Sequence, residues 1–60
     1  MMISPGDTIL ALKDVWNNIY VRATYIGCRK DQPIYCYIQL ENGNYVLTPK
    51  DFLFYLKDGE

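Results

Sequence analysis

Aromatic residues at alternating positions are the side chains of this sequence whose types and spacing could do chemistry, and that chemistry is binding. Tyr35 and Tyr37 stand two positions apart in an alternating run, so both rings fall on one face of an extended segment. Trp16, Tyr20 and Arg22 belong to a neighbouring edge. Tyr, Trp and Arg are enriched at binding hot spots because they offer a large amphipathic area at little entropic cost. These five residues are predicted to bind a protein partner, although tyrosines also pave small sheets and merely cover the core.

Four basic residues offer a second chemistry, the binding of phosphate groups: Arg22, Arg29, Lys30 and Lys50. Tyrosines beside them could stack on bases. The chain has six Lys and Arg against seven Asp and Glu, a net charge of −1, whereas a general nucleic-acid binder usually has a basic domain. Nucleic-acid binding is therefore the alternative function. The salt dependence of the affinity distinguishes it from protein binding, because phosphate contacts weaken steeply as the salt concentration rises.

Catalysis is not expected from these residue types. The chain has no histidine and a single serine, Ser4, which lies in a terminal turn, while its carboxylates fall in turns or at the tail. No nucleophile and base pair is apparent. We therefore expect no enzyme activity and no cofactor. Because the chain has no histidine and its two cysteines, Cys28 and Cys36, lack CxxC spacing, we also expect no metal site. In a reducing compartment both cysteines are expected to be thiols, and a cross-strand disulfide is the alternative under oxidising conditions.

Five short strands are predicted to position these side chains, over residues 8–13, 19–27, 34–40, 44–47 and 52–56. Each run is rich in β-branched, aromatic or other apolar residues and is bounded by turn-forming residues. The alternation of the second run slips by one residue near Tyr25-Ile26, which indicates a bulge. In the last run, Leu53 and Leu56 are expected to close the sheet. The fold class is therefore all-β.

The third strand has one apolar face, which is expected in the core and comprises Ile34, Cys36, Ile38 and Leu40. Tyr35, Tyr37 and Gln39 then face outward. Either Tyr25 or Gly27 is expected across from the two tyrosines. A loop centred on Gln32 would place Cys28 opposite Cys36 and Ile26 opposite Ile38.

Two turns are predicted from local chemistry. Asn42-Gly43 is the sequence preferred by a two-residue type I′ hairpin turn. Thr48 is the expected N-cap of one helical turn, with Pro49 at its first position and Asp51 as the capping-box partner. The domain is predicted over residues 5–56, with tails at 1–4 and 57–60.

Length and hydropathy set further expectations. A 60-residue domain buries only about 60% of the surface of its unfolded chain, so stability is marginal and homodimerisation would add to it. No run approaches the roughly 20 apolar residues of a membrane span. The start, MMISPGD, lacks the features of a signal peptide. We therefore expect a complete short reading frame whose product stays in the cytoplasm.

Four stretches carry a resemblance to a known group: PGDTILAL, WNNIYVRATYIG, YIQLENGN and TPKDFLFYL. Together, from Pro5 to Leu56, they resemble the SH3-like barrel superfold and, within it, the Tudor group. The resemblance implies a small five-stranded SH3-like (Tudor-like) barrel with one helical turn before the last strand.

The Tudor group holds methylated lysine or arginine in an aromatic cage, where a cation gains energy over ring faces. The resemblance places the cage positions at Lys13, Val21, Gln39, Asn42 and Asn44. Trp16 could reach into the place of the first position, and Tyr20 is shifted to the face beside the second. Among these five positions only Asn44 has the residue type that the Tudor group has there. Binding of methylated lysine or arginine is therefore a minor alternative. The leading expectation is a non-enzymatic protein-interaction module, a regulator or inhibitor of a larger protein of the kind that phages, plasmids and bacteria encode.

Overall fold

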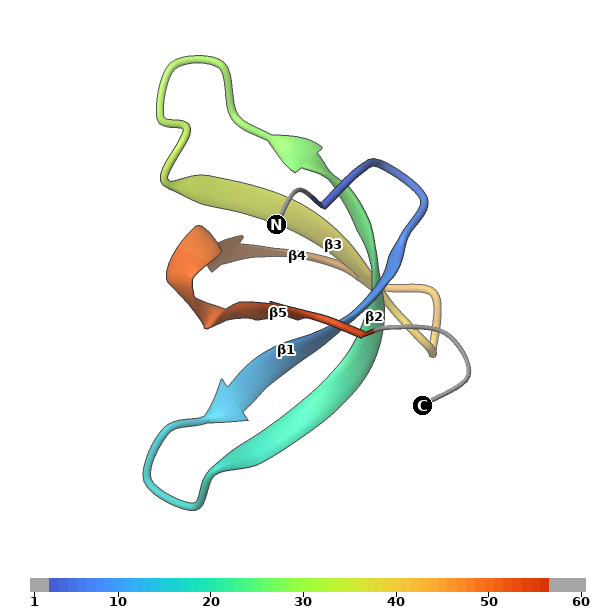
Figure 1. The fold of residues 1–60 in the computed structure, drawn as a ribbon, viewed down its shortest axis with the longest axis vertical. Coiled ribbons are helices and arrows are strands. Elements are labelled where there is room, and N and C mark those ends of the chain that lie inside the picture. The colour runs from blue at the N-terminus through green and yellow to red at the C-terminus, as the bar shows by residue number, and fades with distance from the viewer. Residues whose placement is uncertain (1–2, 57–60) are drawn as a thin grey trace.

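The computed structural model describes residues 3–56, which form one five-stranded antiparallel sheet (Figure 1). The strands are β1 (Thr8–Asp14), β2 (Ile19–Cys28), β3 (Tyr35–Leu40), β4 (Tyr45–Pro49) and β5 (Leu53–Tyr55). Their spatial order is β4-β3-β2-β1-β5, and a 3₁₀ turn, η1 (Lys50–Phe52), links the two edge strands. The all-β class, the five strands and the helical turn before the last strand are confirmed. The predicted tail at 57–60 lies outside the described residues, which contain no helix long and apolar enough to cross a membrane.

The sheet curls into a barrel-like shape because β2 is long and bent (Figure 1). Its first part pairs with β1 and its second part with β3, and a register shift between Tyr25 and Gly27 marks a bulge, as predicted. Bulges bend a strand and increase its twist. The N-terminal segment is hydrogen-bonded to this bend, since Gly6 N donates to Tyr25 O at 2.8 Å and Tyr25 N donates to Asp7 O at 2.9 Å.

The bulge changes the pairing expected for β2 and β3. Cys28 lies opposite Cys36, as predicted, and Gly27 lies opposite Tyr37. The expected pairing of Ile26 with Ile38 is wrong: Tyr25 is the partner of Ile38, and Ile26 is exposed. The residue inserted at the bulge moves every earlier side chain of β2 to the opposite face relative to a regular ladder.

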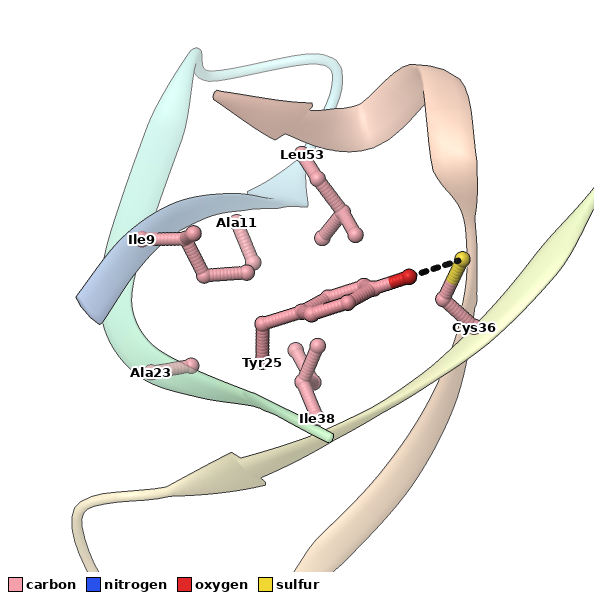
Figure 2. Close-up of a cluster of buried hydrophobic side chains, with 7 residues drawn as sticks. All are labelled: Ile9, Ala11, Ala23, Tyr25, Cys36, Ile38 and Leu53. Carbon is pink, nitrogen blue, oxygen red and sulfur yellow. Dashed lines mark hydrogen bonds between the residues drawn. The ribbon is translucent and has the colours of Figure 1, made fainter. Parts of the chain in front are cut away.

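The core lies on the concave side of the sheet (Figure 2). Its buried members come from four strands: Ile9, Ala11, Ala23, Tyr25, Cys36, Ile38 and Leu53. The Tyr25 ring lies among them and is only 7% exposed, so Gly27, and not Tyr25, is the one of the two expected residues that lies across from Tyr37. Ile34 was expected in the core but is 66% exposed, because it precedes the first paired residue of β3.

The turn at Asn42-Gly43 joins β3 to β4, but it is not a type I′ turn. Gly43 has φ of 92°, whereas Asn42 is not among the described residues with positive φ. Gly43 N donates to Leu40 O at 2.9 Å, and Leu40 N donates to Asn44 O at 2.8 Å. This is a three-residue loop, a type I turn followed by a left-handed glycine. The extra residue pairs Tyr45 with Gln39, whereas a two-residue turn would pair it with Leu40 on the core side.

The link between β4 and β5 also differs from its prediction. Thr48 is buried in β4 opposite Cys36 and is not the N-cap of η1. Pro49 occupies the cap position, and no side chain forms a cap hydrogen bond, so the predicted capping box with Asp51 is wrong. Leu53 enters the core as expected, and Leu56 is half-buried directly after β5.

Candidate functional site

The loop between β1 and β2 presents Trp16 to solvent on a turn that its own hydrogen bonds fix. Asp14 Oδ1 accepts from Trp16 N at 3.1 Å and Asn17 N at 3.3 Å, and Asp14 Oδ2 accepts from Asn17 Nδ2 at 2.7 Å. These hydrogen bonds lower the pKa of the Asp14 carboxyl, and the bond from the Asn17 side chain makes the largest contribution. Asn18 has φ of 54°, a left-handed conformation that asparagine tolerates. The indole is 96% exposed.

Three further large apolar side chains near this turn are exposed. We call them, with the indole, the hairpin patch: Val15, Trp16, Ile19 and Tyr20. The hairpin projects from one end of the molecule, while the loop between β2 and β3 lies at the other (Figure 1). None of the four belongs to the core cluster or to the residues packed against it. Their exposure therefore has no explanation in the packing of the described fold.

The outer face of β1, β2 and β5 continues the hairpin patch. Leu12 pairs with Tyr20, and Leu10 pairs with both Arg22 and Phe54, so these side chains share one face. The Tyr20 and Phe54 rings meet edge to face with centroids 5.5 Å apart, a favoured aromatic geometry. Arg22 is exposed beside them. Two predicted residues, Tyr20 and Arg22, thus lie on one surface.

The predicted tyrosines of β3 lie on a separate surface. Its members are paired residues of β3 and β4 that alternate with the core, and we call it the β3–β4 face: Tyr35, Tyr37, Gln39, Tyr45, Leu47 and Pro49. Tyr37 is 41% exposed, and Tyr35 is half-buried. Tyr37 lies opposite Gly27 of β2, and because glycine has no side chain, the Tyr37 ring has no cross-strand side-chain neighbour at that position.

A polar row divides this face from the surface of Tyr20 and Arg22. Thr8 pairs with Thr24, and Thr24 pairs with Gln39. The predicted binding residues therefore fall on two neighbouring regions of the sheet, and their binding role stays a prediction. The structure places Tyr20 and Arg22 near the hairpin and Tyr35 and Tyr37 on the β3–β4 face.

Five exposed residues of these surfaces were not predicted from the sequence as site residues: Val15, Ile19, Tyr45, Leu47 and Phe54. The register of β4 determines the exposure of Tyr45 and Leu47, and it depends on the three-residue turn. Phe54 could have been found from the alternation of the last strand, where it follows the buried Leu53.

A pocket of about 380 Å³ lies beside the core residues Ala11 and Ile38. Its lining is mainly aliphatic, and its charged residues are Lys13, Arg22 and Glu41. Three of the positions that the resemblance assigned to the cage, namely Lys13, Val21 and Asn42, line this pocket. Among the described residues that line it none is aromatic, so ring faces for a methylated cation are missing there.

The other two cage positions serve the hairpin turn between β3 and β4. Gln39 belongs to the outer face, and its Nε2 donates to Gly43 O at 3.4 Å. Asn44 N donates to Asn42 Oδ1 at 2.9 Å. The side chains of this loop are therefore engaged in holding the turn.

The four basic residues of the nucleic-acid alternative do not share one surface. Arg29 forms two hydrogen bonds with Asp31, at 3.0 Å from Nε and 2.8 Å from the terminal nitrogen, and the guanidinium lowers the pKa of the Asp31 carboxyl. Lys30 is exposed in the same loop, and Lys50 N donates to Ile34 O of that loop at 2.7 Å. Arg22 lies on the outer face near the hairpin.

Comparison of the chain with protein-family models, with curated proteins and with solved structures finds no match in any of the three.

Proposed function

We propose that this chain is an SH3-like barrel that acts as a non-enzymatic protein-binding module, a regulator or inhibitor of a larger protein. The observation that carries the proposal is Trp16, 96% exposed on a turn held by three hydrogen bonds to Asp14. Tryptophan is one of the three residue types enriched at binding hot spots, with tyrosine and arginine. An exposed indole on a pre-ordered turn loses little conformational entropy when it enters a partner's groove.

The neighbouring residues support a protein as the partner. Val15 and Ile19 add aliphatic surface, and Tyr20 and Arg22 add groups that bind both apolar and polar atoms. The barrel assignment is supported by the pairing of β5 with β1 and by the five strands with a short 3₁₀ turn before the last one, which the resemblance implied. In this proposal the β3–β4 face is a second, weaker contact that includes Tyr37.

The test is an affinity pull-down from the native host, followed by mass spectrometry, with wild type and two variants. Trp16→Ala should bind the captured partner at least about fivefold more weakly, because removal of a hot-spot side chain typically costs more than about 1 kcal/mol. Ile34→Ala is the matched control, since Ile34 is a 66% exposed residue in the loop at the opposite end of the molecule (Figure 1).

The proposal fails if the proteins retained by wild type are retained equally by Trp16→Ala. It also fails if Ile34→Ala loses them to the same extent, since the loss would then not belong to the hairpin. A second copy of the chain would be a different occupant of the patch. Sedimentation of wild type and Trp16→Ala identifies it, because only wild type would then form a dimer.

A further inference from the structure

Cys28 and Cys36 are direct partners across the antiparallel strands β2 and β3. The next residues along, Arg29 and Tyr35, are hydrogen-bonded, with Arg29 N donating to Tyr35 O at 2.9 Å. Hydrogen-bonded and non-hydrogen-bonded pairs alternate in an antiparallel ladder, so Cys28 and Cys36 form a non-hydrogen-bonded pair. Such a pair has its Cα atoms about 4.5 Å apart with the side chains close together, within the range of about 4.4–6.8 Å that a disulfide spans.

One hydroxyl group lies against both sulfur atoms. Tyr25 Oη is 2.9 Å from Cys28 Sγ and 3.8 Å from Cys36 Sγ, and Figure 2 shows the second of these contacts at the end of the buried ring. The two thiols therefore converge on the same point of the core. Both cysteines are free in this structure.

The two thiols differ in their access to solvent. Cys36 is 0% exposed, whereas Cys28 is half-buried at the end of β2. Hydrogen bonds with Cys36 and Tyr25, together with the charge of Lys50, lower the pKa of Cys28. Burial raises the pKa of Cys36. An accessible thiol that ionises more readily is the better nucleophile, and a buried thiol beside it is suited to react second.

We propose that Cys28 and Cys36 form a reversible dithiol–disulfide site that reacts with low-molecular-weight disulfides, with Cys28 as the attacking thiol and Cys36 as the resolving thiol. The Cys28 thiolate attacks one sulfur of the small disulfide. The sulfur–sulfur bond of the reagent breaks, a mixed disulfide forms on Cys28, and one small thiolate leaves.

The second step closes the bond between the strands. Cys36 gives up its proton and attacks the Cys28 sulfur, and the second small thiolate leaves and is protonated. The protein loses two electrons and two protons in all, and the small disulfide is reduced to two thiols. The bond would join β2 to β3 beside the loop that carries Arg29 and Ile34, at the end of the molecule opposite the hairpin patch.

The first experiment incubates the wild-type protein with oxidised glutathione, quenches the reaction with acid, and measures mass and free thiols. The expected product has lost two hydrogen atoms, carries no glutathione, has no free thiol, and returns to the dithiol form in reduced glutathione. A product that keeps glutathione on Cys28, keeps both thiols, or is cross-linked to a second chain would overturn the proposal.

The order of the two steps is tested with two matched variants. Cys36→Ser should accumulate the mixed disulfide on Cys28, because the resolving thiol is absent. Cys28→Ser should react at least tenfold more slowly, because only the buried thiol remains. Equal rates for the two variants would contradict the assignment.

A third measurement does not depend on the folding of either variant. Peptide mapping of wild type at early reaction times should find the first glutathione on Cys28. Finding it on Cys36 instead would overturn the roles assigned here.

Discussion

Tyr25 places a phenol at the centre of the core, where sulfur atoms are its hydrogen-bonding partners. The sequence did not predict this position, because the bulge beside Tyr25 shifts the alternation by one residue and a lone tyrosine fits either face. Cys36 and Ile38 were predicted correctly as core residues, since the strand that carries them is regular. At the scale of single residues, prediction succeeded where the ladder is regular. It failed next to the bulge and at Ile34, which precedes the first paired residue of β3.

The buried phenol of Tyr25 should lower the stability of the fold at alkaline pH. The hydrogen bond to Cys28 and then burial raise the pKa of Tyr25 above its ordinary value of 10.0. Because the folded pKa is the higher one, the stabilising contribution is complete below pH 10 and is lost as pH rises above it, where the unfolded state ionises first. The free energy of unfolding should therefore fall above about pH 10, measured by urea denaturation across a pH series.

Tyr25→Phe is the control for this pH dependence, because it keeps the ring and removes the titrating group. The decline above pH 10 should become shallower in this variant. A smaller decline should remain in this variant, because burial also raises the pKa of Cys36. An unchanged alkaline decline in Tyr25→Phe would show that Tyr25 is not its source.

At the scale of elements, the five strands and the 3₁₀ turn could be predicted because each apolar run is bounded by turn-forming residues. The faces of β4 could not, because they depend on whether the turn after β3 has two residues or three. Gly43 N bonded to Leu40 O defines the longer turn, and its extra residue turns Tyr45 and Leu47 outward. The candidate site on β4 was missed for this reason.

Gly43→Ala tests the turn. Gly43 has φ of 92°, and a Cβ there would meet no atom within 4 Å, so the cost is conformational and not steric. We expect a loss of about 1–2 kcal/mol in the free energy of unfolding, since left-handed backbone is unfavourable for alanine. Chemical denaturation followed by circular dichroism measures it.

Two neighbouring substitutions calibrate this result. Gly43→Asn should lose less than Gly43→Ala, because asparagine tolerates the left-handed region. Glu41→Ala, on an exposed residue of the same turn, should change stability by less than about 0.5 kcal/mol. If Gly43→Ala is no less stable than Glu41→Ala, the turn does not require its left-handed glycine.

At the scale of the whole molecule, a small core lies on the inner face of the strands, and the large exposed apolar surface lies on their outer face and on the hairpin between β1 and β2. For 60 residues the net stability is expected to be about 3–9 kcal/mol. Ile38 is only 1% exposed, so its replacement by alanine should lower the free energy of unfolding by about 2–5 kcal/mol, a large part of that stability. Thermal and urea unfolding measure this loss.

Trp16→Ala and Tyr37→Ala should behave differently from Ile38→Ala. Both side chains are exposed and outside the core cluster, so each change should leave the free energy of unfolding within about 0.5 kcal/mol of wild type while weakening partner binding by more than about 1 kcal/mol. If either variant unfolds, that residue belongs to the core and its binding role is wrong.

The exposed indole also determines how this protein can be observed. The chain has a single tryptophan, and Trp16 is 96% exposed when the chain is folded. Its fluorescence should therefore resemble that of indole in water in both the folded and the unfolded state, so emission will not follow unfolding. A blue shift of that emission would instead report the transfer of the ring from water into a partner, which provides an optical titration of binding without any added label.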